Sequence, residues 1–158
     1  MDVKRALGIA IGVLLLACRP ALAVAPGVMI QAVKGEFEDI RERVVLAIEN
    51  RGLVLNYTAH IGNMLERTGR DIGRAQQIYN KAELFEFCSA AVSRSTMEAD
   101  PHNIVHCPYA IAIYTLPKQP GRVYVSYHKP LPRGSAQSIK ALREVGRLLD
   151  GIARAALK

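Results

Sequence analysis

Hydrophobic residues recur at helical spacing in two long segments of the chain. The pattern predicts an amphipathic helix over Glu36 to Arg51, where acidic residues fill the first turn and Gly52 follows the last. It predicts a second, longer helix over Ser135 to Leu157. The two apolar stripes comprise Phe37, Ile40, Val44, Val45 and Ile48, and then Ile139, Leu142, Val145, Leu149 and Ile152.

Shorter segments rich in β-branched and aromatic residues predict strands. The clearest are Tyr109 to Leu116 and Arg122 to His128, because the five residues between them include two prolines and a glycine and favour an antiparallel hairpin. A helix over Ser89 to Ala99 must end at Asp100, since the residue before Pro101 is pushed out of the α region. Three further strands are predicted over Val28 to Val33, Leu53 to Ala59 and Leu84 to Cys88.

The segment between the second and third predicted strands has the weakest pattern. A helical turn over Ile61 to Arg67 is expected to stop at Gly69, and Thr68 to Ala82 shows no clear period. We therefore expect a long loop there, of the kind that often carries function. Arg70 and Arg74 within it could bind an anion, although a solvated surface is the simpler interpretation.

Taken together, these elements predict an α+β fold, a two-layer sandwich in which an antiparallel or mixed sheet of about five strands carries two long helices on one face. In the hairpin, alternation directs Ile111, Ile113, Val123 and Val125 toward the helices. The opposite, open face could bind a small ligand, but exposed tyrosines favour contact with another subunit or a protein partner. Its candidate binding residues are Tyr114, Tyr124, Ser126 and His128.

The first 23 residues have the layout of a secretory signal peptide. Lys4 and Arg5 precede an uncharged apolar run over residues 6–17, which is shorter than the about 20 residues that span a bilayer. Small residues before the end of the segment favour cleavage after Ala23, which predicts one mature domain over residues 24–158 in the periplasm or outside the cell. An uncleaved anchor is the alternative to cleavage, and a lipoprotein-like box ending at Cys18 would instead tether the domain to a membrane.

The net charge of +7 falls to +5 when three basic residues and one acidic residue leave with the signal. A solvated basic face on the C-terminal helix accounts for much of the remainder, and an exported protein is not expected to bind nucleic acid. Membrane association is expected only if Cys18 is lipidated.

Cys88 and Cys107 are the two cysteines of the predicted mature chain. In an oxidising compartment a disulfide is the first expectation, and it suits their positions, because Cys88 ends one predicted strand and Cys107 directly precedes another. The competing hypothesis is a metal or haem site formed with His102 and His106, since thiolates and imidazoles are the ligands that zinc, copper and haem iron prefer. A reactive thiol at Cys107 is a third interpretation, although His106 beside it would point to the opposite face of a strand.

Four motifs taken in order resemble the family catalogued as domain of unknown function 302. They are Glu86-Phe87-Cys88-Ser89-Ala90, Met97-Glu98-Ala99-Asp100-Pro101, His106 to Tyr114, and Val123 to Pro130. The resemblance covers roughly Val28 to Leu157 and implies a compact α+β domain with a curved antiparallel sheet, sometimes oligomeric, and no established reaction. It also implies that the paired cysteines mark an exported branch of the family.

No nucleophile elbow, phosphate-binding loop, dinucleotide fingerprint or H-E-x-x-H motif occurs in the chain. The sequence therefore favours a non-enzymatic exported binding or assembly domain without a cofactor, joined internally by Cys88 and Cys107. The alternative is a redox, metal or haem protein that uses these cysteines with His102 and His106.

Overall fold

The structure, a computed structural model, describes residues 25–158. The predicted signal peptide, its cleavage after Ala23 and the lipidation alternative at Cys18 lie outside the described residues. Between residues 25 and 158, no helix is both long and apolar enough to cross a membrane.

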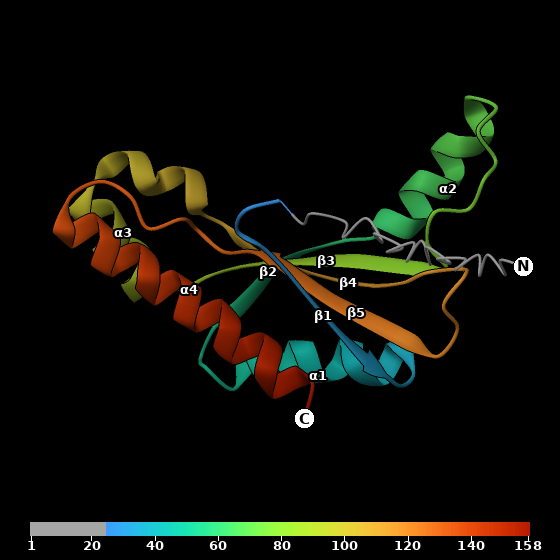
Figure 1. Ribbon diagram of the computed structural model, residues 1–158, viewed down its shortest axis with the longest axis horizontal. Helices are drawn as coiled ribbons and strands as arrows, with labels where there is room; N and C mark the ends of the chain where they lie inside the picture. The colour runs from blue at the N-terminus through green and yellow to red at the C-terminus, as the bar shows by residue number, and fades with distance from the viewer. Residues whose placement is uncertain (1–24) are drawn as a thin grey trace, which may run out of the picture.

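Five antiparallel strands form one sheet in the order β1-β5-β4-β3-β2 (Figure 1). The predicted hairpin is confirmed, with Ile113 opposite Val125 and Tyr114 opposite Tyr124. Strand β2 lies at one edge and carries a bulge between Leu55 and Tyr57, a feature that weakens edge-to-edge pairing. The strands are β1 (Val28–Lys34), β2 (Val54–Ala59), β3 (Lys81–Cys88), β4 (Tyr109–Thr115) and β5 (Arg122–His128).

Two long helices, α1 (Phe37–Glu49) and α4 (Ala136–Ala156), cover one face of the sheet and confirm the predicted two-layer α+β arrangement. Strand alternation turns one set of side chains toward these helices, and the apolar stripe of each helix meets them. The largest fully buried side chains of this core are Phe85, Phe87, Ile40, Ile48, Ile111, Ile113, Leu149 and Ile152.

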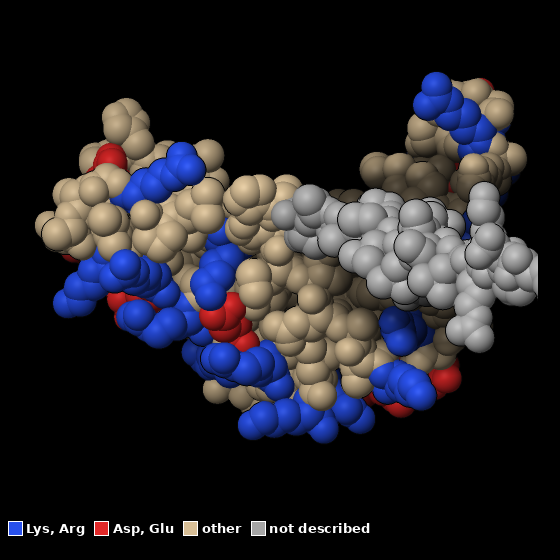
Figure 2. Space-filling model, in the orientation of Figure 1, with Lys and Arg blue, Asp and Glu red and all other residues tan. Residues whose placement is uncertain are grey.

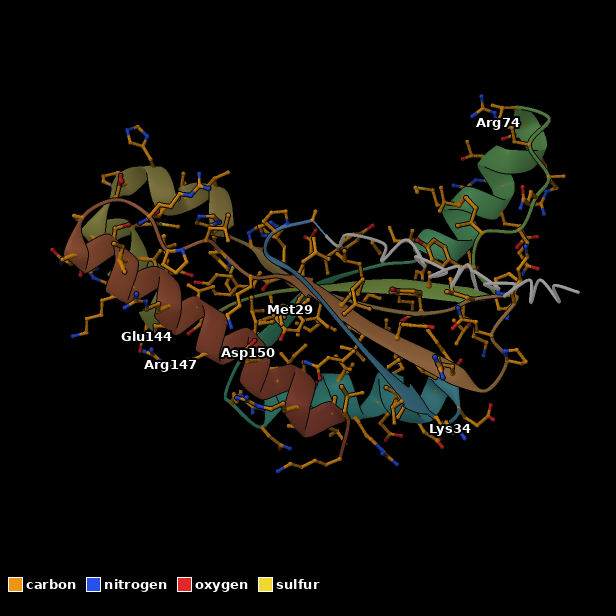
Figure 3. The ribbon with its side chains drawn as sticks, in the orientation of Figure 1. Met29, Lys34, Arg74, Glu144, Arg147 and Asp150 are labelled. Carbon is orange, nitrogen blue, oxygen red and sulfur yellow. The ribbon has the colours of Figure 1, made fainter. Side chains whose placement is uncertain are left out.

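Polar contacts fix α4 to strand β5 and to the residue that follows it. The Tyr127 hydroxyl donates to Asp150 Oδ1 at 2.7 Å, and Lys129 Nζ donates to Oδ2 at 2.6 Å. A Cβ at position 146 would lie 2.7 Å from Lys129 Cε, so Gly146 leaves room for the lysine to cross the helix. Figure 3 shows Asp150 on the side of α4 turned toward the sheet.

A second polar network joins three elements at the other end of α4. Helix α3 (Ala90–Ala99) begins at its N-cap Ser89 and is followed by the 3₁₀ helix η1 (Pro101–His106). The buried side chain of Asn103 donates from Nδ2 to the Thr96 carbonyl and to Ser138 Oγ, both at 3.0 Å. This amide therefore ties η1 to α3 and α4.

The prediction of a long loop over Thr68 to Ala82 is wrong in its bounds. Helix α2 spans Ile61–Asp71 and continues through Gly69, and β3 already begins at Lys81. Gly69 does not stop the helix but lets the returning chain pass closely, since a Cβ there would lie 2.6 Å from the Arg74 carbonyl oxygen. Within α2 no residue is buried, and the helix stands away from the body of the domain (Figure 1).

Strand β3 also begins earlier than predicted because Lys81 to Glu83 already pair with β4, and two of these charged residues form ion pairs with α1. Lys81 Nζ donates to Glu38 Oε1 at 2.8 Å, and Arg41 Nε donates to Glu83 Oε2 at 2.7 Å. Basic side chains gather along the helical side of the molecule in Figure 2, as expected for a solvated helix face.

Candidate functional site

The open face of the sheet carries the four predicted binding residues. Tyr114 of β4 and Tyr124 of β5 are cross-strand neighbours whose rings stack with centroids 5.0 Å apart. Tyr79 meets Tyr114 edge to face at 5.4 Å, and the Tyr124 hydroxyl donates to Gln119. Ser126 and His128 follow along β5, so alternation places all four residues on the side away from α1 and α4, where His128 is exposed and the other three are half-buried.

A hollow of 440 Å³ occupies this face near η1. Its floor is made of small or apolar side chains from three neighbouring strands: Leu84, Ala110, Ala112 and Ser126. Val105, His106 and Pro108 form one wall, and His128 lies at the rim. The hollow exists because β4 carries alanine at two successive open-face positions, where larger side chains would fill the space.

A second hollow of 330 Å³ continues along the same face toward α2. It shares Leu84, Ala112 and Ser126 with the first hollow and ends against Ile61, Tyr79 and Tyr114. We call these two adjoining hollows, which share three lining residues, the open-face groove. One end presents imidazoles and the other presents tyrosine rings, with an apolar floor between them.

Cys88 and Cys107 come together beside the η1 end of this groove. Their sulfur atoms lie 3.1 Å apart, and Ser93 Oγ lies 3.7 Å from the Cys107 sulfur. Both cysteines are free thiols in this structure and half-buried. Burial, together with the hydrogen bond and charge of Cys107, raises the pKa of the Cys88 thiol to about 11, so this thiol stays protonated at neutral pH.

A family model described as domain of unknown function DUF302 matches residues 29–156. The chain belongs to the DUF302 family. Among solved structures, it is similar to the crystal structure of an uncharacterised conserved DUF302 protein from Bacillus stearothermophilus, with a TM-score of 0.67 and 11% sequence identity. The match covers 84% of this chain and 99% of the other, and at this identity it shows the shared fold alone. No curated protein matches the chain.

The DUF302 fold does not bring the four predicted metal ligands together. In the part of the chain that the structure describes, no three His, Cys, Asp or Glu side chains gather in a way that could hold a metal ion. His102 is exposed on η1, whereas His106 lines the groove. Burial, with a smaller contribution from the charge of His128, lowers the pKa of His106 and so favours the neutral imidazole.

Helix α2 and the return segment over residues 72–80 form a projecting unit that we call the α2 arm. The predicted anion site at Arg70 and Arg74 lies on this arm. Arg70 Nη1 pairs with Glu66 Oε1 at 2.6 Å, and Arg74 lies near the tip of the arm in Figure 3. A hollow of 400 Å³ between α2 and its return segment includes all three side chains. The glutamate offsets the charge of one arginine, so the hollow is only weakly basic.

Sequence reasoning missed several residues that shape the open-face groove. Tyr79 fell inside the predicted loop, and Leu84, Ala110 and Ala112 are too small or too ordinary to attract attention as binding residues. One signal was present, because two alanines alternate with buried isoleucines along β4. Small residues at open-face positions of a central strand mark a place where the surface is hollow.

Proposed function

We propose that this DUF302 protein is an exported domain that binds a small, mainly apolar ligand in the open-face groove. The observation that carries the proposal is the groove itself. Its two adjoining hollows, of 440 and 330 Å³, lie in the size range of small-molecule sites. The apolar floor suits the body of a ligand, and Ser126, His106 and His128 supply polar groups that could fix its orientation.

Anilinonaphthalene sulfonate, a dye with fused rings and one anionic group, is a suitable probe for the groove. We expect saturable binding to the folded protein, measured by fluorescence titration. Ala112→Trp fills the floor where both hollows meet and should weaken binding at least roughly tenfold, a loss of about 1.4 kcal/mol.

Ala32→Trp is the matched control. Ala32 is exposed on β1, opposite Tyr124 of β5, yet it lines neither hollow of the groove. The control variant should bind the dye like the unaltered protein. Equal binding by both tryptophan variants, with unchanged folding by circular dichroism, would contradict a groove site.

The proposal includes a disulfide between Cys88 and Cys107 in the exported protein. It is supported by the signal-like leader, the oxidising compartment this leader implies, and the 3.1 Å between the sulfurs. A free-thiol count on protein isolated from the periplasm and denatured without reductant should give no free thiol. Two free thiols, or stoichiometric metal in the same native sample, would instead favour the redox or metal alternative.

We propose, as a second role, that the α2 arm mediates assembly with a second copy of the chain. An 11-residue helix without buried side chains is only marginally stable alone, and Met64 and Ile72 expose 43% and 59% of their surface. Light scattering coupled to size exclusion should give a dimer or larger assembly. Met64→Lys should shift it to monomer, whereas Asn63→Lys, the neighbouring exposed control, should not.

A further inference from the structure

The Cys88–Cys107 pair links a wall of the groove to the sheet. Cys88 is the last residue of β3, and Cys107 follows η1 directly. His106 and Pro108, the two chain neighbours of Cys107, both line the groove. A bond between the sulfurs therefore acts within one residue of the groove wall.

Helix η1 has little other anchorage on this side. Its Asn103 side chain is held by Thr96 and Ser138, but these partners lie on α3 and α4. Ile104 and Val105 are 61% and 78% exposed and so add little apolar packing. At its groove end, η1 is thus held by the backbone, by the 3.7 Å contact of Ser93 Oγ with the Cys107 sulfur and by the contact between the two sulfurs.

We propose that thiol–disulfide exchange at Cys88 and Cys107 fixes or releases the η1 wall and thereby sets the affinity of the open-face groove. This inference rests on the proposed function, because it assigns a regulatory site to the same groove. The co-reactant is a low-molecular-weight disulfide such as oxidised glutathione.

The exchange balances as two displacements. The Cys107 thiolate, after losing its proton to solvent, attacks one sulfur of glutathione disulfide, whose S–S bond breaks and releases one glutathione thiolate that takes up a proton. Cys88 then loses its proton and attacks the Cys107 sulfur, which releases the second glutathione. The protein gives up two electrons and two protons, and one glutathione disulfide becomes two thiols.

The electrostatics support this order of attack. The Cys88 thiol is protonated at neutral pH, so Cys107 is the cysteine expected to react first. Burial raises the Cys88 pKa most, and the hydrogen bond and the charge of Cys107 raise it further. Both disappear once the Cys107 sulfur is in a mixed disulfide, so Cys88 becomes easier to deprotonate when its turn comes.

The test compares the full chain treated with glutathione disulfide and with dithiothreitol. Dye affinity is measured by fluorescence, and amide hydrogen exchange is followed over residues 101–107. We expect the reduced protein to bind the dye several-fold more weakly and to exchange faster in this segment. Cys107→Ser, which removes the cysteine that attacks first, should match the reduced protein under both treatments, which separates the disulfide from other effects of the reagents.

Each outcome decides the inference. Dye binding that Ala112→Trp abolishes, but that is equal in both redox states, overturns the inference and leaves the proposed function standing. Dye binding that is absent in both states, or unaffected by Ala112→Trp, overturns the proposed function and the inference with it. A redox difference in dye affinity and in exchange, lost together in Cys107→Ser, supports both.

Discussion

The Tyr127 hydroxyl and the Asp150 carboxylate lie 2.7 Å apart and join the outer part of the sheet to α4. Burial opposes ionisation of Asp150, but hydrogen bonds from Lys129 and Tyr127 outweigh it and lower the pKa of the carboxyl. The same burial and the hydrogen bond to Asp150 raise the pKa of the Tyr127 hydroxyl. One carboxylate thus holds a phenol and an ammonium group against the helix.

Replacing this carboxylate should cost stability in a pH-dependent way. Asp150→Asn should lower the free energy of unfolding by about 1–3 kcal/mol at neutral pH, because two charge-assisted hydrogen bonds are weakened. A lowered carboxyl pKa stabilises the fold above the ordinary value of 3.8, and this contribution is lost as the pH falls through the lowered value. Urea unfolding at several pH values should show the difference from the unaltered protein shrinking in acid, and a pH-independent difference would contradict the assignment.

The buried amide of Asn103 should be a second point of sensitivity. Asn103→Ala should lower the free energy of unfolding by about 1–3 kcal/mol, since the Thr96 carbonyl and the Ser138 hydroxyl lose their partner. His102→Ala, an exposed neighbour on η1, should change stability by less than about 0.5 kcal/mol. A double variant with Ser138→Ala should be less destabilised than the sum of the single variants.

The cysteine pair predicts a conditional effect on stability. If the disulfide forms, Cys88→Ser should lower the free energy of unfolding by about 3 kcal/mol without reductant, because the bond closes a loop between residues 19 apart. The same variant should differ little from the unaltered protein in dithiothreitol. Cys107→Ser should give matching values, and a substantial difference between the two variants would argue against a shared bond.

Replacing Gly69 should change local stability in the α2 arm and leave the hydrophobic core intact. Gly69→Ala places a Cβ 2.6 Å from a backbone oxygen of the return segment, so α2 and residues 72–80 must shift. Because no α2 side chain is buried, we expect faster amide exchange in the arm and a nearly unchanged thermal midpoint. Thr68→Ala, one residue earlier and exposed, is the control. A large fall in the thermal midpoint would show that the arm unfolds together with the core.

The sequence predicted those parts of the fold in which local pattern and tertiary packing agree. The β4–β5 hairpin and α4 have a regular apolar period, and the Asp100-Pro101 step stopped α3 where expected. The sequence did not predict the bounds of elements that depend on contacts between residues far apart in the chain. Gly69 looked like a stop until Arg74 was seen to pass over it, and Lys81 fell in the segment without a clear period, although it pairs with Thr115 of β4.

The sequence predicted on which face of the sheet the candidate site lies, but not which residues complete it. The alternation of side chains along β4 and β5 was sufficient to predict that Tyr114 and Ser126 face away from α1 and α4. The groove itself depends on Tyr79 and Leu84, which reach it from segments whose position relative to the hairpin no local pattern specifies. The contact between Cys88 and Cys107 was foreseen because strand ends limit where a side chain can lie, whereas the path of η1 separates His102 from the groove.

Strand order also dictates when the fold can be completed. Among residues 25–158, strand β1 pairs with β5 alone and begins with Val28 opposite His128, so the first strand of the sheet cannot pair until the last has been made. At a synthesis rate of about 5–20 residues per second, this interval is on the order of 5–20 seconds. Sheets closed by such distant pairing also fold slowly once the chain is complete. The five-stranded sheet of this protein therefore cannot be completed until nearly all of the chain has been synthesised.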